Sequence, residues 1–439
     1  MFRFDLGTRP VVGIGDGVTI NAILRDRPGG FRRWRELAVV LGEMEITGVF
    51  TAEGEDWRRQ RRLAVTALNV AHLHRYFDVI HVATQRLQRT LRDAAISGTP
   101  LAIEHVFASY TIDVTSALAF GRDLRALDRD LTDLREDSDR VFAAAGRRVS
   151  ATVPYWRVVR LPADRAVDRS LTKLEHAVAG FIAEARERMQ RRPELHEQPE
   201  NFLEAMLGAQ ALDGSYDDGA LFGNTLTMLL AGEDTTSRTL AWTVWLLACH
   251  PDVQDRLATE ADVLLGTRLV ADDYETAAAF GYGEAVLRES VRLRPASAVA
   301  LIEAVDDTVI TDVAIPAGTR LMLLTRHAAV QEKSFARPQT FDPTRWLADG
   351  HGDGAHDPKN FLAFGAGPRF CPGRNLAFLE AKAALAMLAH NFHMELDPAA
   401  PPVREQFAFT IAPRGLRVHL RERHTHPNEG TAPRETAAT

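Results

Sequence analysis

The sequence predicts a mainly α-helical fold with a small β-rich region, and two kinds of segment indicate it. Stretches rich in Ala, Leu and Arg have helical periodicity over residues 55–92, 163–190 and 221–250. Short β-prone segments come late in the chain, at residues 308–315 and 407–411. We therefore expect long helices to build the core and the strands to stay peripheral.

Composition favours one large globular domain. The chain has 439 residues, of which 46% are hydrophobic and 25% charged. No linker, charge block or repeat interrupts residues 1–423, whereas residues 424–439 lack periodicity and are expected to form a disordered tail. The net charge of −7 argues against nucleic-acid binding. With two cysteines and neither a signal peptide nor an apolar membrane span, we expect a cytoplasmic protein without a membrane anchor.

The helix expected over residues 221–250 is apolar and long, but polar residues interrupt its centre. Gly232 costs about 1 kcal/mol relative to alanine in a helix interior. A buried Asp234 needs partners, and the Thr235 hydroxyl can bond to the carbonyl four residues earlier and bend the helix. We expect a bend in the helix and a pocket at this point. The alternative is a solvated turn with incidental polar residues.

The sequence FGAGPRFCPG surrounds Cys371 with glycines, a proline and an arginine. We expect Gly367 and Gly373 to adopt positive φ and to wrap backbone N–H groups around the sulfur. Arg369 can pair with a haem propionate. A helix over residues 376–390 would place the sulfur near a helix N-terminus, where the dipole favours a thiolate. The loop therefore indicates an axial thiolate ligand of haem iron; an ordinary buried cysteine is the alternative.

These residues resemble the haem-binding loop of the cytochrome P450 family, Phe-x-x-Gly-x-Arg-x-Cys-x-Gly. Every motif position is matched, by Phe364, Gly367, Arg369, Cys371 and Gly373. Further motifs follow in family order from residue 57 onwards. The resemblance implies a mainly α, triangular-prism fold with a small β-rich region, and haem b with an axial cysteinate from Cys371.

The resemblance gives a role to the basic motif WRRQRR. Trp57 and Arg61 are four residues apart, share a helical face, and by this resemblance hold a haem propionate. Arg58, Arg59 and Arg62 remain partly free as a basic patch. We expect the patch to attract an acidic electron donor, a ferredoxin or flavodoxin with its reductase. A nucleic-acid or other anion site is the competing interpretation, but no aromatic series accompanies Trp57.

Two other motifs acquire roles through the same resemblance. Asp234 is implied to carry protons to the distal face of the haem, and Thr235 to hydrogen-bond oxygen and water there. Glu289, Arg292 and Arg345 are implied to form a buried charge network behind the haem. We assign this network a structural role, because removing one member leaves a buried unpaired charge.

The chain departs from the family pattern in two places. Residues 3–12 already indicate the first sheet hairpin, where family members usually carry a further helix, so we expect a short N-terminus or a differently built substrate entrance. Residues 301–304 lack the arginine that many members direct to a propionate. Propionate binding then rests on the tryptophan and two arginines already named, with Arg326 or His327 as helpers.

The implied function is oxygen-dependent monooxygenation of a small, largely apolar organic substrate, with two electrons from a separate partner. A haem-thiolate peroxygenase or isomerase that needs no redox partner is an alternative, which Asp234 and Thr235 argue against. A haem sensor without catalysis is disfavoured because the sequence shows no output domain. Substrate-pocket candidates, each of which fits core packing equally well, are Ile46, Val49, Phe50, Leu230, Ala231, Val299, Leu301, Phe409 and Ile411.

Overall fold

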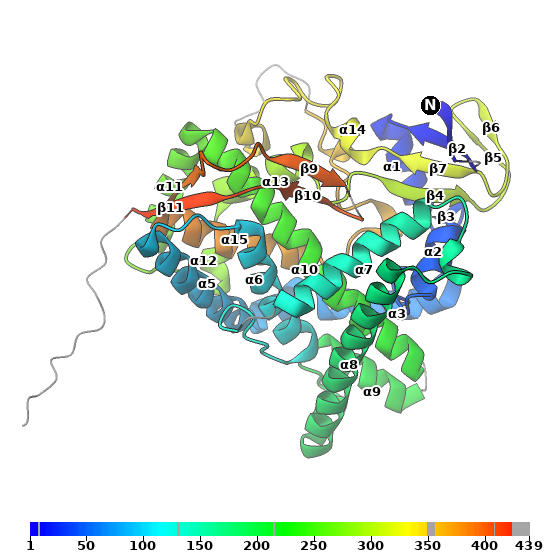
Figure 1. The fold of residues 1–439 in the computed structure, drawn as a ribbon, viewed down its shortest axis with the longest axis horizontal. Helices are drawn as coiled ribbons and strands as arrows, with labels where there is room; N and C mark the ends of the chain where they lie inside the picture. The colour runs from blue at the N-terminus through cyan, green and yellow to red at the C-terminus, as the bar shows by residue number, and fades with distance from the viewer. Residues whose placement is uncertain (8, 130–131, 214–215, 349–355, 408, 424–439) are drawn as a thin grey trace, which may run out of the picture.

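The structure, a computed structural model, describes residues 1–7, 9–129, 132–213, 216–348, 356–407 and 409–423. Helices make up most of these residues, and short strands gather mainly at one side of the molecule (Figure 1). The expected mainly α fold with a small β-rich region is therefore confirmed. The expected tail at residues 424–439 lies outside the described residues, and the single domain over residues 1–423 stays a prediction.

The helices of the described chain range in length from five to 32 residues. In chain order they are α1 (Gly17–Arg25), α2 (Arg35–Gly42), α3 (Gly54–Ala67), α4 (Val70–Arg75), α5 (Phe77–Ser97), α6 (Ile103–Phe120), α7 (Thr132–Ser150), α8 (Pro162–Arg191), α9 (Phe202–Asp213), α10 (Asp218–Cys249), α11 (Pro251–Leu265), α12 (Tyr274–Ala278), α13 (Gly281–Leu293), α14 (Thr325–Ala329) and α15 (Arg374–Asn391). Short 3₁₀ turns lie at Tyr155–Arg157, Pro193–His196, Pro343–Trp346, Pro358–Asn360 and Gly367–Arg369.

The structure confirms two of the three predicted long helices, and the prediction of the third is wrong. Helix α8 matches the expected 163–190, and α10 matches the expected 221–250. The segment 55–92 instead divides into α3, α4 and the start of α5. Asn69 causes one break, because its side chain accepts a hydrogen bond from the His72 N–H at 2.8 Å and caps a new helix.

The strands form one five-stranded sheet and three two-stranded ones. They are β1 (Phe2–Leu6), β2 (Arg9–Ile14), β3 (Phe31–Arg33), β4 (Ala300–Ala304), β5 (Thr308–Ile310), β6 (Val313–Ile315), β7 (Arg320–Leu323), β8 (Phe392–Leu396), β9 (Arg404–Phe407), β10 (Ile411–Arg414) and β11 (Val418–Glu422). The large sheet has the order β1-β2-β7-β4-β3, and the pairs are β5–β6, β8–β11 and β9–β10. Figure 1 shows the N-terminal strands β1 and β2 beside the later strands β4 and β7.

The three predicted β segments have different outcomes in the structure. The hairpin over residues 3–12 is present as β1 and β2. The segment 308–315 is a hairpin rather than one strand, since Thr311 and Asp312 turn the chain with φ of 40° and 66°. The segment 407–411 is not a strand: β9 ends at its first residue and β10 begins at its last.

Helix α10 runs through the centre of the molecule and packs closely on α6 (Figure 1). A Cβ atom at Gly232 would lie 2.4 Å from Oγ1 of Thr115 on α6, so the close approach requires glycine. One turn away, the Thr111 hydroxyl donates to the Glu233 carbonyl at 3.1 Å. The backbone at Gly232 and Glu233 therefore lies against α6, whereas Thr235 on the same turn is exposed.

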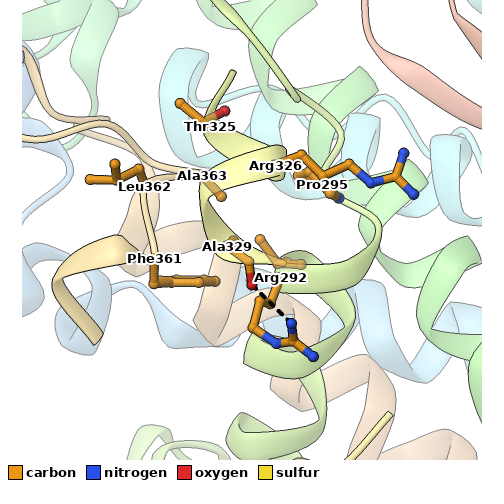
Figure 2. A pocket seen from close by; sticks show the side chains of 9 residues that line it. Arg292, Pro295, Thr325, Arg326, Ala329, Phe361, Leu362 and Ala363 are labelled. Carbon is orange, nitrogen blue, oxygen red and sulfur yellow. Dashed lines mark hydrogen bonds between the residues drawn. The ribbon is translucent and has the colours of Figure 1, made fainter. Parts of the chain in front are cut away.

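The structure contains the expected charge network of Glu289, Arg292 and Arg345. The Glu289 carboxylate accepts from Arg292 at 2.7 and 2.8 Å and from Arg345 at 3.0 Å. The Trp346 indole donates to the same carboxylate at 2.9 Å. Figure 2 shows Arg292 reaching the Ala329 carbonyl, at 2.9 Å, beside a small cavity between α13, α14 and the segment before the cysteine. The network thus ties α13 to the chain that leads to the loop of Cys371.

We predict that Glu289→Gln lowers the free energy of unfolding by about 3–5 kcal/mol, because it leaves two buried guanidinium groups without their anion. Denaturant unfolding followed by far-UV circular dichroism measures this. The matched control is Glu55→Gln, which removes an exposed ion pair to Arg58 and should cost less than about 1 kcal/mol. Equal effects for the two variants would contradict the structural role of the network.

Candidate active site

The cysteine loop, residues 364–373, is closed by its own backbone. The Cys371 N–H donates to the Phe364 carbonyl at 2.8 Å. Gly367 has a φ of 68°, and a Cβ atom there would lie 2.6 Å from the Cα of Arg25 at the end of α1. Only glycine fits this position, so helix α1 fixes the loop from one side.

The sulfur of Cys371 lies just before the N-terminus of α15. Backbone N–H groups of Gly373 and Arg374 donate to it. Gly373 does so with a φ of −81°, so the expected positive φ there is wrong. Burial raises the pKa of the Cys371 thiol, and the N–H groups, Arg61 and Arg374 oppose this only in part. The expectation that the helix N-terminus secures a thiolate is therefore incomplete, whereas a metal ion deprotonates a coordinating thiol outright.

Helix α3 packs the expected cofactor residues against this loop. Trp57 and Arg61 are buried on one face of α3. The guanidinium of Arg369 lies 4.4 Å from the centre of the Trp57 ring, and that of Arg61 lies 4.6 Å from the centre of the Phe370 ring. The structure thus brings Trp57, Arg61 and Arg369 together beside Cys371.

The two expected helpers have partners of their own. Arg326 forms an ion pair with Glu405 at 2.7 Å. His327 contacts the side chain of Gln331 at 2.7 Å. Because Arg369 also has an acidic partner, Glu53, such contacts do not decide the matter, and the help of Arg326 or His327 to a propionate stays a prediction.

Sequence reasoning missed two further arginines, Arg27 and Arg33. Together with Arg61 and Arg369, they form the arginine cluster. Burial lowers the pKa of Arg27 to about 10, with a further contribution from Arg369. Burial holds the pKa of Arg33 well below its ordinary value, with smaller contributions from the charges of Arg27 and Arg369. Glu53, ion-paired with Arg369, opposes these shifts. Positive charge therefore exceeds negative charge in this buried region.

This region fits a haem. Nitrogen atoms of Arg27 (Nε and Nη2), Arg61 (Nη2) and Arg369 (Nε) are buried without a hydrogen-bond partner. Such groups are costly unless an acceptor meets them. Haem supplies two propionates for the arginines and an iron that takes a cysteinate ligand. Within the described ranges, no group of three or more His, Cys, Asp or Glu side chains could hold a metal ion.

Helix α10 directs its central acid and alcohol to different partners. The Thr235 side chain is exposed, and its hydroxyl donates to the Ala231 carbonyl at 3.0 Å. Asp234 is buried; it accepts from the Thr410 hydroxyl and forms an ion pair with Arg238 at 2.5 Å. Burial raises the pKa of Asp234, and Arg238 and Thr410 oppose the shift. The acid is thus held in place by α10 itself and by the turn before β10.

An acid cluster, Glu104, Asp139 and Glu233, surrounds the same Arg238. Arg238 lies 3.0 Å from Asp139 and 3.8 Å from Glu104. Burial raises the pKa of Glu104 to about 7, and burial with the charge of Asp234 raises that of Glu233 well above its ordinary value. Asp139 is 55% exposed, so carboxyl groups lead from the surface to Asp234. No motif marked them, because they come from three separate helices.

Glu380 on α15 is another buried acid that the sequence did not mark. The Thr236 side chain on α10 hydrogen-bonds to it. Burial raises the pKa of Glu380 to about 8, so it is largely neutral at pH 7. A neutral carboxylic acid therefore joins the helix after the cysteine to the helix that carries Asp234.

The substrate-pocket candidates divide by burial. Ile46, Leu230 and Ile411 lie in the hydrophobic core, Ala231 is exposed, and the half-buried remainder are Val49, Phe50, Val299, Leu301 and Phe409. Ring centres of Phe409 and Phe50 are 6.3 Å apart. Phe142, which the sequence did not suggest, stacks on Phe409 with ring centres 5.4 Å apart. The structure thus groups Phe50, Phe142 and Phe409 as an aromatic trio.

The basic patch on α3 is weaker than expected. Arg58 pairs with Glu55 at 3.0 Å, and Arg59 pairs with Asp56. Arg62 is exposed. Sequence reasoning overlooked the acids one turn earlier on the same helix, which neutralise most of the patch.

The small cavity of Figure 2 is separate from the cysteine loop's sulfur, and it has room for little more than a water molecule. It is bounded by the buried Arg292 and the helix α14. We therefore assign it no ligand. Over the described part of the chain, no helix combines the length and apolar character that a membrane crossing requires.

Comparison with known proteins agrees with this geometry. The curated protein LUTEIN DEFICIENT 5, chloroplastic, of Arabidopsis thaliana is 28% identical over 96% of this chain and 72% of its own length. Cytochrome P450 27C1 of Danio rerio is 26% identical over 96% of this chain and 79% of its own. The crystal structure of the cytochrome P450DA heme domain matches the fold with a TM-score of 0.83, at 23% identity over 96% of this chain and 90% of that one.

The sequence model of the family described as Cytochrome P450 matches residues 1–420. That range contains the cysteine loop, the paired cofactor residues of α3 and the polar centre of α10. The family implies a cysteine-ligated haem and the use of dioxygen, an organic substrate and a redox partner. The chain therefore belongs to the cytochrome P450 family of haem-thiolate monooxygenases.

Proposed function

We propose that this monooxygenase oxidises a small, largely apolar organic substrate with haem b as cofactor and a separate ferredoxin or flavodoxin, with its reductase, as electron donor. The observation that carries the proposal is the placement of Cys371 beside a buried arginine cluster that lacks its anions. The overall reaction consumes substrate, O₂, two electrons and two protons, and gives hydroxylated substrate and water. We keep the cytoplasm as the proposed location, on the low cysteine content.

In this proposal Cys371 binds the iron, and Trp57, Arg61 and Arg369 hold the propionates. When bound, the haem supplies the two-electron activation of dioxygen, helped by electron donation from the cysteinate. Gly367 keeps the loop against α1, and Phe364 closes it through its carbonyl. These residues fix the cofactor's orientation before substrate binds.

Protons would pass through Asp234. Its carboxyl group lies at the buried end of a path that begins in the acid cluster, and Arg238 opposes the rise in its pKa that burial causes. Rotation of its side chain away from Arg238 would move a proton from the Asp139 side to the site face of α10. The Thr235 hydroxyl, now bonded to the Ala231 carbonyl, is placed to donate at that face.

The aromatic trio, in which Phe142 is buried and Phe50 and Phe409 are half-buried, supports an apolar substrate. Its rings offer an apolar surface that suits a hydrocarbon or a planar ring, although the Arg33 guanidinium lies over the ring of Phe50. For the electron donor, support comes from Arg62 and from Phe370, which is 43% exposed directly before Cys371. An exposed aromatic beside the ligand loop is the kind of group that protein interfaces bury.

The first prediction concerns the ligand. We expect the reduced, carbon monoxide-treated protein to show a strongly red-shifted Soret band that Cys371→Ala loses, because only a thiolate ligand produces it. The control is Cys249→Ala, which removes the exposed second cysteine and should keep the band. Retention of the band in Cys371→Ala would refute the assigned ligand.

The second prediction concerns Thr235. With a substrate found by spectral titration, Thr235→Ala should lower the product formed per electron pair by about tenfold, because the hydroxyl that directs a proton is gone. The missing electrons should appear as hydrogen peroxide, which uses O₂, two electrons and two protons. Thr235→Ser keeps the hydroxyl and should keep the yield. A wild-type yield in Thr235→Ala would contradict the role.

The third prediction concerns Asp234. Asp234→Asn should slow turnover by about 100-fold and enlarge the solvent deuterium isotope effect, since an amide cannot carry the proton. Asp139→Asn removes the exposed carboxylate at the outer end of the path, where water can supply the proton instead, and should slow turnover much less than Asp234→Asn does. If hydrogen peroxide alone drives full turnover in the wild type, with no reductant, the enzyme is a peroxygenase and Asp234→Asn will have no effect.

A further inference from the structure

Arg33 ends strand β3 directly opposite Ile302 of β4. Opposed residues in an antiparallel pair lie on the same face of a sheet, and consecutive residues alternate between faces. Arg32 accordingly points away from that face and pairs with Glu303 at 2.6 Å. Residues 301–304 contain no basic side chain. The cation beside Ile302 therefore comes from the neighbouring strand, through a pairing that links residues far apart in the sequence.

The contacts of Arg33 leave its charge unbalanced. Its Nε donates to the Phe50 carbonyl at 2.7 Å, and its guanidinium carbon lies 3.5 Å from the centre of the Phe50 ring. Neither contact is an anion. Within the described ranges no carboxylate forms an ion pair with Arg33, and Glu53, the acid that opposes its pKa shift, is already paired with Arg369.

Arg27 adds to the same excess. It is 5% exposed, and its Nε and Nη2 atoms are buried without a hydrogen-bond partner. Among the described residues, Glu53 is the carboxylate that opposes the pKa shifts of Arg27, Arg33 and Arg369 together. Uncompensated buried charge is costly, and a bound anion with two carboxylates would remove most of the cost.

We propose that Arg33 binds a haem propionate, in place of a basic residue on β4, and that Arg27 is a second buried charge which the propionates neutralise. This inference rests on the proposed haem b cofactor, whose two propionates are the ligand groups concerned. The planar guanidinium suits a carboxylate because it can offer two parallel N–H donors. Arg33 is then a cofactor-binding residue, and Arg27 acts through the field it adds.

The test compares Arg33→Gln with Arg32→Gln in the haem-loaded full chain. Arg32 is the matched control because it is the adjacent residue of the same strand, on the opposite face, with its own partner. Haem loss is measured by transfer to excess apomyoglobin, and the ferric/ferrous midpoint potential by redox titration. Circular dichroism and thermal unfolding check that each variant is folded.

We expect Arg33→Gln to release haem about tenfold faster than the wild type, as loss of an outer partner of a metal site typically does. Its midpoint potential should shift to more negative values, because an uncompensated propionate stabilises the ferric state. Arg27→Gln should shift the potential in the same direction with a smaller effect on haem loss. Arg32→Gln should leave both quantities near wild type.

Arg33→Lys keeps the test decisive if the glutamine variant does not accumulate. Lysine retains the charge but not the two-pronged donor, so we expect a near wild-type potential with faster haem loss. Arg33 variants that match Arg32→Gln in both readouts would overturn the inference and leave the cofactor proposal intact. A wild-type protein that takes up no haem would overturn both, so the two failures are distinguishable.

Discussion

The free-energy cost of a charged sulfur at the edge of an apolar core governs the arrangement around it. Burial alone raises the pKa of the Cys371 thiol, and the backbone donors of Gly373 and Arg374 offset only part of that. The ligand therefore depends on its metal, and the protein's task is to hold the loop ready. It does so with α1 behind Gly367 and with α15, which is buried over most of its length. A rigid loop lowers the entropy lost when iron binds.

The protein contains two clusters of opposite charge near the site, the arginine cluster and the acid cluster. The arginine cluster lies by the cysteine loop with too few acids, and the acid cluster lies around Arg238 with several carboxyl groups for one guanidinium. Each would be unfavourable alone in a dry interior. In the proposed function, the cofactor's carboxylates meet the excess of positive charge, and the acid cluster carries protons. Because the two clusters lie on different elements, anion binding and proton transfer would then use separate residues.

Sequence reasoning succeeded where the signal was local. The positive φ of Gly367, the shared face of Trp57 and Arg61 on α3, and the limits of α8 and α10 all follow from short-range rules. It failed where pairing across the fold decided the outcome. The sequence around Arg33 carries no signal that β3 pairs with a strand some 270 residues later. Likewise, the Asn69 cap overrode a continuous helical pattern between residues 55 and 92.

The turn before β10 joins two functions that are usually considered apart. Phe409 belongs to the aromatic trio, and the hydroxyl of its neighbour Thr410 donates to Asp234 and accepts from Arg238. If substrate contacts the ring of Phe409 as proposed, a shift of that ring would also move the hydroxyl of Thr410 that bonds to Asp234. Substrate binding and the proton affinity of Asp234 would then be coupled through this turn. Substrates that contact this ring differently would then differ in binding strength and also in coupling efficiency, which is the fraction of the reducing electrons that ends in product.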